Sequence, residues 1–235
     1  MSVGWGGGLD LNLSYAVTNK FAVFGSATVN DGNRSGSSLM GDKYTVNKND
    51  YVLKTGIGYF SKIDNRLFGL FEAYIGTAIT KVDNFWYFKN FQEEADYTDA
   101  KYKSIFGQVN LGKRKGKIEY AIGLRLNYSN YSDLNFFNSH PNLRYIRTTY
   151  QNLHGLSADP AVSFSYNLNK IRFNAQAGLA FPLSSSSALK TDTHTTYDGS
   201  TPIITEVVSN ERLSLGALIG RLSVQYSLNF AGGKK

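Results

Sequence analysis

The chain alternates apolar and polar residues along much of its length, most cleanly over residues 118–128. The bulky positions there are Ile118, Tyr120, Ile122, Leu124, Leu126 and Tyr128, and between them lie Glu119, Ala121, Gly123, Arg125 and Asn127. Successive side chains of a strand point to opposite faces, so this segment has one apolar face and one polar face. The pattern recurs in further segments, which are separated alternately by short basic turns and long polar stretches. This arrangement is typical of a transmembrane β-barrel.

The pattern predicts nine full strands and the end of a tenth. They cover residues 2–5, 9–17, 21–30, 51–59, 67–82, 105–111, 118–128, 162–166, 173–179 and 218–230. Single-chain bacterial barrels have an even number of strands, and the short turn after residue 17 requires a strand before 9–17. We therefore expect one all-β domain over residues 1–235, a transmembrane antiparallel up-and-down barrel of about ten strands. Eight is the alternative, if two segments are loop hairpins.

Segment length predicts the orientation, because bacterial barrels have short periplasmic turns and longer extracellular loops. The expected periplasmic turns contain Asn19, Asp64, Lys115 and Asn169, and the expected surface-exposed loops surround Gly36, Glu93, Asn138 and Asp198. With this register, Ile122, Leu124, Leu126, Leu222, Val224 and Leu228 would face lipid, while Glu119, Arg125, Arg221 and Gln225 would face the lumen.

Composition agrees with a strand-rich membrane protein. The 235 residues include 23 Gly, 16 Tyr and 15 Phe but only 4 Pro, and no apolar run approaches the ~18 residues of a membrane helix. Aromatic residues suit strands and interfacial girdles. The chain has no Cys, which excludes disulfides and thiolate sites. No signal peptide precedes residue 2, so we expect a mature or truncated form of an exported protein.

Three stretches resemble a known group of proteins: LDLNLSYAVTNKFAVFGSA, FGQVNLGKRKGKIEYAIGLRLNYSNY and ADPAVSFSYNLNKIRFNAQAGLAFPL. They are similar to a family of uncharacterised outer-membrane barrel proteins, often lipoproteins, from Bacteroidota. The resemblance implies a β-barrel in the outer membrane of a Gram-negative bacterium. Members carry a lipidated Cys upstream of the first strand, and this chain has none. The resemblance implies no catalytic residue.

The inward-facing positions include charges of both signs. They are Asp10, Lys54, Glu72, Glu119, Arg125, Arg172 and Arg221. Charges inside a small barrel carry a large desolvation cost unless they are paired, and side chains just fill a barrel of about eight strands. We therefore expect a plugged lumen in which Glu72 or Glu119 pairs with one of the three arginines. The alternative is a narrow or gated pore, which would make the protein a small-solute channel.

Aromatic residues are densest in residues 84–91, where Phe85, Trp86, Tyr87, Phe88 and Phe91 lie at the outer end of an expected strand. They are typical of a girdle at the membrane interface, or of a surface that docks a partner protein or a glycan. The acidic residues that follow are Glu93, Glu94, Asp96 and Asp99. Their spacing matches no calcium loop, so we expect a solvated loop.

Basic residues in the turns carry much of the net charge of +7. They are Lys20, Lys62, Arg66, Lys113, Arg114, Lys115, Lys117 and Lys170, with Lys234 and Lys235 at the end. Charges beside a bilayer are attracted to anionic head groups, so the expected partners are outer-membrane lipid and lipopolysaccharide, with no nucleic acid.

An enzyme would need converging catalytic groups at one rim. The three histidines, His140, His154 and His194, fall in expected loops, and His154 with Asp159 is the best candidate pair. No G-x-S-x-G or H-E-x-x-H motif occurs, and we assign no catalytic, cofactor or metal residue. The sequence favours a structural or binding subunit of a larger outer-membrane complex. The alternatives are the channel and an enzyme that modifies lipid A or cleaves peptides.

Overall fold

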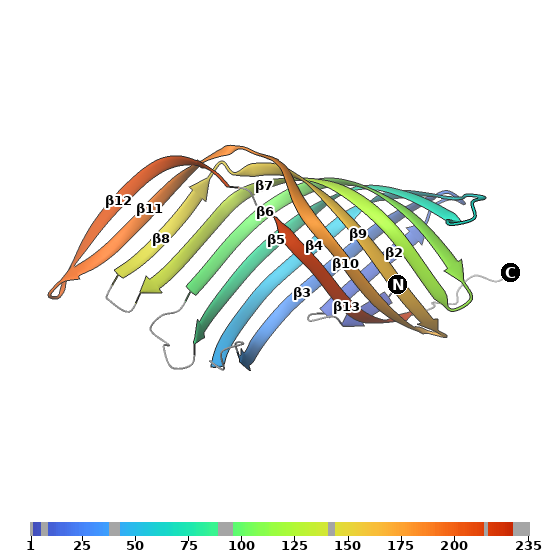
Figure 1. Cartoon of the computed structure of the whole chain (residues 1–235), viewed down its shortest axis with the longest axis horizontal. Helices are drawn as coiled ribbons and strands as arrows, with labels where there is room; N and C mark the ends of the chain where they lie inside the picture. The colour runs from blue at the N-terminus through green and yellow to red at the C-terminus, as the bar shows by residue number, and fades with distance from the viewer. Residues whose placement is uncertain are drawn as a thin grey trace.

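The computed structural model describes residues 2–5, 9–37, 43–88, 96–140, 144–213 and 216–227, and these form one antiparallel, up-and-down sheet (Figure 1). Among these residues every regular element is a strand, so the all-β prediction is confirmed. No helix among them is long and apolar enough to cross a membrane.

The sheet contains thirteen strands in the described part of the chain. In chain order they are β1 (Ser2–Trp5), β2 (Leu9–Ala16), β3 (Phe21–Ser37), β4 (Lys43–Lys62), β5 (Leu70–Phe88), β6 (Asp96–Lys115), β7 (Ile118–His140), β8 (Arg144–Gln151), β9 (His154–Leu168), β10 (Ile171–Ser185), β11 (Ser187–Asp198), β12 (Thr201–Arg212) and β13 (Ala217–Ser227). The predicted count of about ten strands, or eight, is therefore wrong for the whole sheet. The additional strands are β8, β11 and β12.

The ten strands expected from the sequence pair with one another in cyclic order. Strands β1 to β7 pair in sequence, β7 pairs with β9, and β9 leads through β10 and β13 back to β1. In Figure 1, β10 and β13 cross in front of the wall that contains β3 to β6. The whole thirteen-stranded sheet is still open, because among the described strands β12 pairs only with β11. The described sheet as a whole is thus not closed into a barrel, which corrects the expected ten-stranded barrel.

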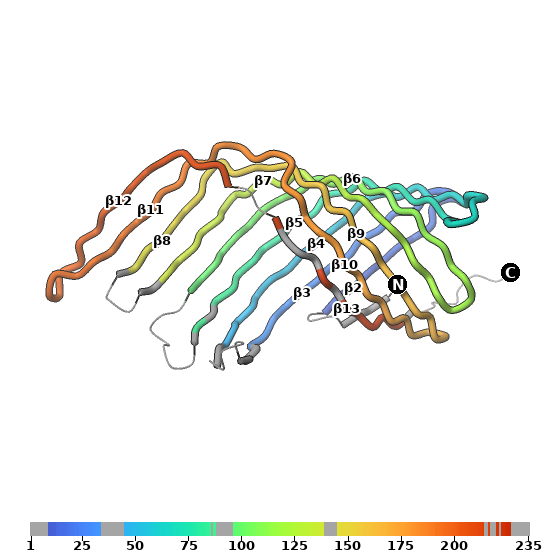
Figure 2. The backbone as a smooth tube through the Cα atoms, in the orientation of Figure 1, coloured from blue at the N-terminus to red at the C-terminus, as the bar shows by residue number. Residues whose placement is uncertain are grey.

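The sheet branches at β7. Its first half, Ile118–Asn130, pairs with β9, and its second half, Leu134–His140, pairs with β8. Strand β11 adds to β8 and β12 adds to β11, so these three strands extend the sheet (Figure 2). We call β8, β11 and β12 the extension.

Strands replace most of the expected loops. Residues near Gly36, Asn138 and Asp198 lie in β3, β7 and β11, and Glu93 lies outside the described residues. The pairing of β3 with β4 continues to Ser37 opposite Lys43. Backbone hydrogen bonds need no apolar face, so pairing continues where the apolar alternation has ended. The sequence pattern therefore underestimated strand length.

A small apolar core lies at the branch point. It consists of Ala100, Leu134, Tyr150, Leu153 and Ala188, with Val82, Tyr131, Phe136 and Leu213 packed against it. Leu153 is 2% exposed, and its carbonyl accepts a hydrogen bond from the Tyr131 amide at 2.9 Å. This core joins the extension to the ten paired strands.

Candidate functional site

The outer face of the paired strands is apolar and exposed. On β7, Ile122, Leu124 and Leu126 are 43–47% exposed, while Gly123 and Arg125 between them are half-buried. Leu222 and Val224 on β13 are also exposed. The side chain of Arg221 and all of Leu228 lie outside the described residues, and Gln225 is half-buried. Large apolar side chains are thus directed outward, as in proteins whose solvent is lipid.

Aromatic residues mark both ends of this apolar belt. Three outward pairs are each separated by eight positions: Tyr51 and Tyr59 on β4, Tyr120 and Tyr128 on β7, and Phe173 and Phe181 on β10. At about 3.3 Å per residue, eight positions span roughly 26 Å along a strand. Transmembrane barrels carry an apolar band roughly 25 Å tall between two aromatic girdles. Because the strands of such a barrel are tilted, the height between two aromatic positions is less than their separation along the strand.

One hydrogen-bonded chain of polar side chains crosses the inner face from β7 to β5. Arg125 donates to Gln108 Oε1 from Nε (2.8 Å) and Nη2 (2.6 Å). Gln108 donates to Asn110 Oδ1 (2.8 Å), and Asn110 donates to Glu72 Oε2 (3.1 Å). The predicted residues Arg125 and Glu72 are therefore connected through two amides rather than by a direct ion pair.

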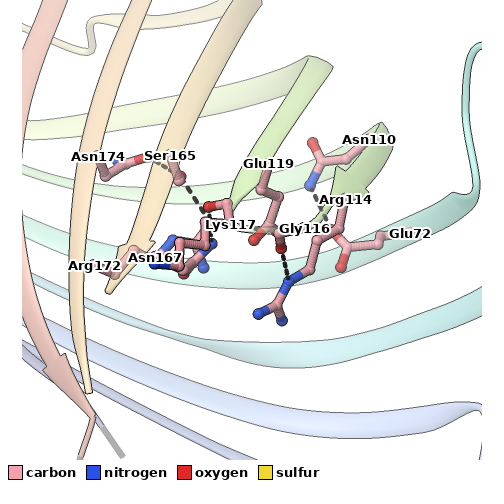
Figure 3. Close-up of polar contacts among 10 residues, drawn as sticks. All are labelled: Glu72, Asn110, Arg114, Gly116, Lys117, Glu119, Ser165, Asn167, Arg172 and Asn174. Carbon is pink, nitrogen blue, oxygen red and sulfur yellow. Dashed lines mark hydrogen bonds and ion pairs between the residues drawn. The ribbon is translucent and has the colours of Figure 1, made fainter. Parts of the chain in front are cut away.

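A second network joins β7 to β10 across β9 (Figure 3). Glu119 Oε1 and Arg172 Nη2 form an ion pair at 3.3 Å. Arg172 also donates to Ser165 Oγ (3.0 Å), and Ser165 donates to Asn174 Oδ1 (2.8 Å). Ser165 is 1% exposed, so its hydroxyl needs these partners. This network lies beside the β6–β7 turn, where Arg114 Nε donates to the Gly116 carbonyl.

Aromatic rings fill part of the interior; the sequence pattern places Tyr74 inward, but it did not predict the inward packing of Phe24 and Phe106. The ring centroid of Phe24 lies 5.6 Å from that of Tyr74 and 6.3 Å from that of Phe106. The Arg125 guanidinium carbon lies 5.0 Å from the Phe106 ring centroid, a cation–π contact. These rings lie over Gly56 and Gly76, where a Cβ atom would meet them at 2.7–2.8 Å. The glycines at inward positions of the sequence were the signal that could have predicted these rings, because they leave room for large neighbours.

The inner face of the described strands contains cavities. One of about 480 Å³ is lined by five of the predicted charges, Lys54, Glu72, Glu119, Arg125 and Arg172. A second, of about 270 Å³, is bounded by residues of the apolar core and its surroundings. Asp159 lines both cavities and lies directly opposite Arg125 in the β7–β9 register.

The predicted charges outside these two networks are Asp10 on β2, Lys54 on β4 and Arg221 on β13. Asp10 is buried and accepts a hydrogen bond from Thr28 Oγ1 at 2.6 Å. Lys54 on β4 lines the larger cavity. The backbone of Arg221 lies opposite Gln176 in the β10–β13 register.

The aromatic patch lies beyond the apolar belt. Phe85 and Tyr87 share one face of β5, with ring centroids 5.7 Å apart, and Lys81 and Asp83 separate them from the belt. The side chains of Trp86 and Phe88, and all of Phe91, lie outside the described residues. Glu93 and Glu94 also lie outside them. Asp96 and Asp99 belong to β6, which corrects the expected loop at those two positions.

His154 and Asp159 do not converge. The two residues are five positions apart on β9. Because successive side chains of a strand alternate between its faces, they point to opposite faces. Both residues border the 270 Å³ cavity, but the His154 ring lies 6.0 Å from the outward Tyr128 ring, whereas Asp159 accepts a hydrogen bond from Ser157. No group of three metal-ligating side chains occurs among the described residues.

No protein family matches the chain, and no curated protein or solved structure matches it either.

Proposed function

We propose that the ten cyclically paired strands form a closed transmembrane β-barrel in the outer membrane of a Gram-negative bacterium. In this proposal the protein is a structural or binding subunit of an outer-membrane assembly, and the extension projects from the membrane surface. The resemblance to the Bacteroidota barrel family supports the same compartment. The observation that carries the proposal is the exposed apolar belt, because a soluble protein rarely exposes an apolar patch of this extent.

Short turns gathered at one end of the belt support the orientation. The turns at residues 17–20, 63–69, 116–117 and 169–170 connect strands at one end. Each contains one basic residue, and the adjoining strand ends add Lys62, Lys113, Arg114 and Lys115. Basic residues at a membrane surface are attracted to anionic head groups. The ends of β3 to β7 that continue beyond the belt, and the extension, lie at the other end. We assign this end to the extracellular side.

The inner face favours a plug over an open pore. The Arg125 and Arg172 networks link inward side chains of β5, β6, β7, β9 and β10. The Phe24, Tyr74 and Phe106 rings fill further space on the inner face. A second candidate, the small-solute channel, is favoured by the two cavities that share Asp159. Planar-bilayer recording separates the two, because only the channel gives steady conductance in the wild-type protein.

Two neighbouring positions on β9 test the membrane location. The natural chain has no Cys, so Val162→Cys and Ser163→Cys each introduce a single thiol for a fluorescent label. Val162 is exposed on the belt and Ser163 lines the larger cavity. In liposomes, brominated lipid tails should quench the label at position 162 and spare the label at position 163. Equal quenching of both by aqueous iodide, with no effect of brominated lipid, would reject the proposal.

A further inference from the structure

Lysines gather on the outer face immediately beyond the apolar belt. Lys81 on β5 lies directly opposite Lys101 on β6, and Lys103 lies opposite Ile79, an exposed belt residue. Like charges directly opposite each other on paired strands are destabilising. Lys101 and Lys103 are exposed, and Lys81 also forms an ion pair with Asp83 at 3.2 Å. The register therefore places three lysines at the edge of the belt. Asp83 and Asp133 offset part of their mutual repulsion, and a bound anion would offset more.

Residues directly opposite one another on neighbouring strands form rows across the sheet. Carboxylates lie mainly in the outward-facing row next to the lysine row, on the side away from the belt. Asp83 is directly opposite Asp99, and Asp133 lies opposite Lys101 in the lysine row. Along β5 the outward order is thus apolar, cationic and then anionic.

An aromatic row follows. Phe85, Tyr97 and Phe137 lie directly opposite one another on β5, β6 and β7. The row continues into the extension, where the Phe137 and Tyr145 rings stack at 5.9 Å and the Tyr145 and Tyr197 rings meet edge to face at 6.1 Å. Arg147 lies opposite Phe137 in the same row. Flat aromatic faces with polar neighbours suit ligands that combine apolar ring faces with hydroxyl groups, as sugars do.

We propose that this outer face of β5–β7 binds lipopolysaccharide. The inference rests on the proposed membrane location and adds a specific lipid to it. Acyl chains lie on the belt, lipid phosphates contact Lys81, Lys101 and Lys103, and core sugars stack on the row begun by Phe85, Tyr97 and Phe137. The apolar, cationic and aromatic rows follow the order of these groups in the lipid, with the Asp83–Asp99 row between the lysines and the aromatic residues, and one continuous face presents all of them.

The test measures the affinity of the refolded full chain in detergent micelles for lipid A with both phosphates, for dephosphorylated lipid A and for lipopolysaccharide bearing core sugars. The variant is K81Q/K101Q/K103Q. The matched control is K115Q/K117Q/K170Q, which removes three exposed lysines from the turns at the opposite end. Each lysine near an anionic lipid contributes about fivefold, so the variant should bind phosphorylated lipid A on the order of a hundredfold more weakly. The control should retain wild-type affinity, and dephosphorylated lipid A should not distinguish the three proteins.

Equal weakening of the variant and the control would indicate general charge attraction and would overturn the site. A single Phe137→Thr change should abolish the preference for core-bearing lipopolysaccharide over lipid A; an unchanged preference would overturn the sugar contacts. The labels at positions 162 and 163 report membrane insertion separately. Insertion without lysine-dependent lipid binding refutes this inference alone, whereas failure to insert refutes the proposed function.

Discussion

Glu119 and Arg172 meet at 3.3 Å although they belong to β7 and β10, which are separated by β9. Arg172 reaches over Ser165 on β9 and donates a hydrogen bond to its hydroxyl. The pair therefore connects three adjacent strands through side chains as well as through the backbone ladder.

Breaking this pair should cost more than replacing it. Arg172→Met leaves Glu119 half-buried without its cation, and we expect a loss of about 1–2 kcal/mol, limited because both side chains are about a third exposed. The double variant Glu119→Gln with Arg172→Met should lose less than the sum of the single changes. Urea unfolding of the refolded protein gives the coupling energy, and strict additivity would show that the pair contributes nothing.

Arg125 should stabilise the interior without acting as the only barrier to ions. Arg125→Ala removes the donor to Gln108 and the contact over Phe106, so the thermal unfolding midpoint should fall. The remaining rings and the Glu119–Arg172 network still obstruct the lumen, so we expect no stable large conductance in a planar bilayer. Steady conduction of small sugars by the wild-type protein would favour the channel instead.

Glycine at position 76 should be required by packing. A Cβ there would lie 2.5 Å from the Thr55 carbonyl oxygen and 2.7 Å from the Phe106 ring, so Gly76→Ala should destabilise by about 1–3 kcal/mol. Gly107 on the neighbouring strand has nothing within 4 Å of its Cβ position, and Gly107→Ala serves as the control. Thermal unfolding compares the two variants, and equal stability would disprove the close contact.

Labelling of single cysteines in intact cells should distinguish the two ends of the sheet. Asp64 lies in a short turn and Asp198 ends β11, and both are exposed. A membrane-impermeant maleimide should label Asp198→Cys in intact cells, but Asp64→Cys only after the outer membrane is opened. The reverse pattern would invert the proposed orientation.

The extension should loosen in acid. Burial raises the pKa of Asp192, but hydrogen bonds from Thr148 (2.6 Å) and Lys190 outweigh it and hold that pKa below its usual range. A depressed carboxyl pKa contributes stability above its unfolded value of about 4, and this stability is lost as pH falls through the folded value. The protection factors of the β11 and β12 amides against hydrogen exchange, corrected for the intrinsic pH dependence of exchange, should therefore fall below about pH 4. Asp192→Asn should remove this dependence while exchange in β5 stays unchanged.

The sequence by itself determined which residues face which side. A side-chain period of two separates Leu124 from Arg125, and any one-residue slip would bury the apolar set against the polar interior. All ten expected strands occur for this reason, and the short turns between them were located as well. Asn169, expected in such a turn, has a φ of 54°, a conformation that asparagine tolerates.

Only the tertiary structure decided the extension and the partners of the inward charges. Strand β12 is exposed on both faces, so its sequence has no apolar face from which a strand could be predicted. Its place beside β11 depends on backbone hydrogen bonds. Arg125 contacts Gln108 and Arg172 contacts Glu119 because residues distant in sequence become neighbours when strands pair. The period of a strand fixes the direction of each side chain, whereas its partners depend on which strands lie beside it, and that information is not local.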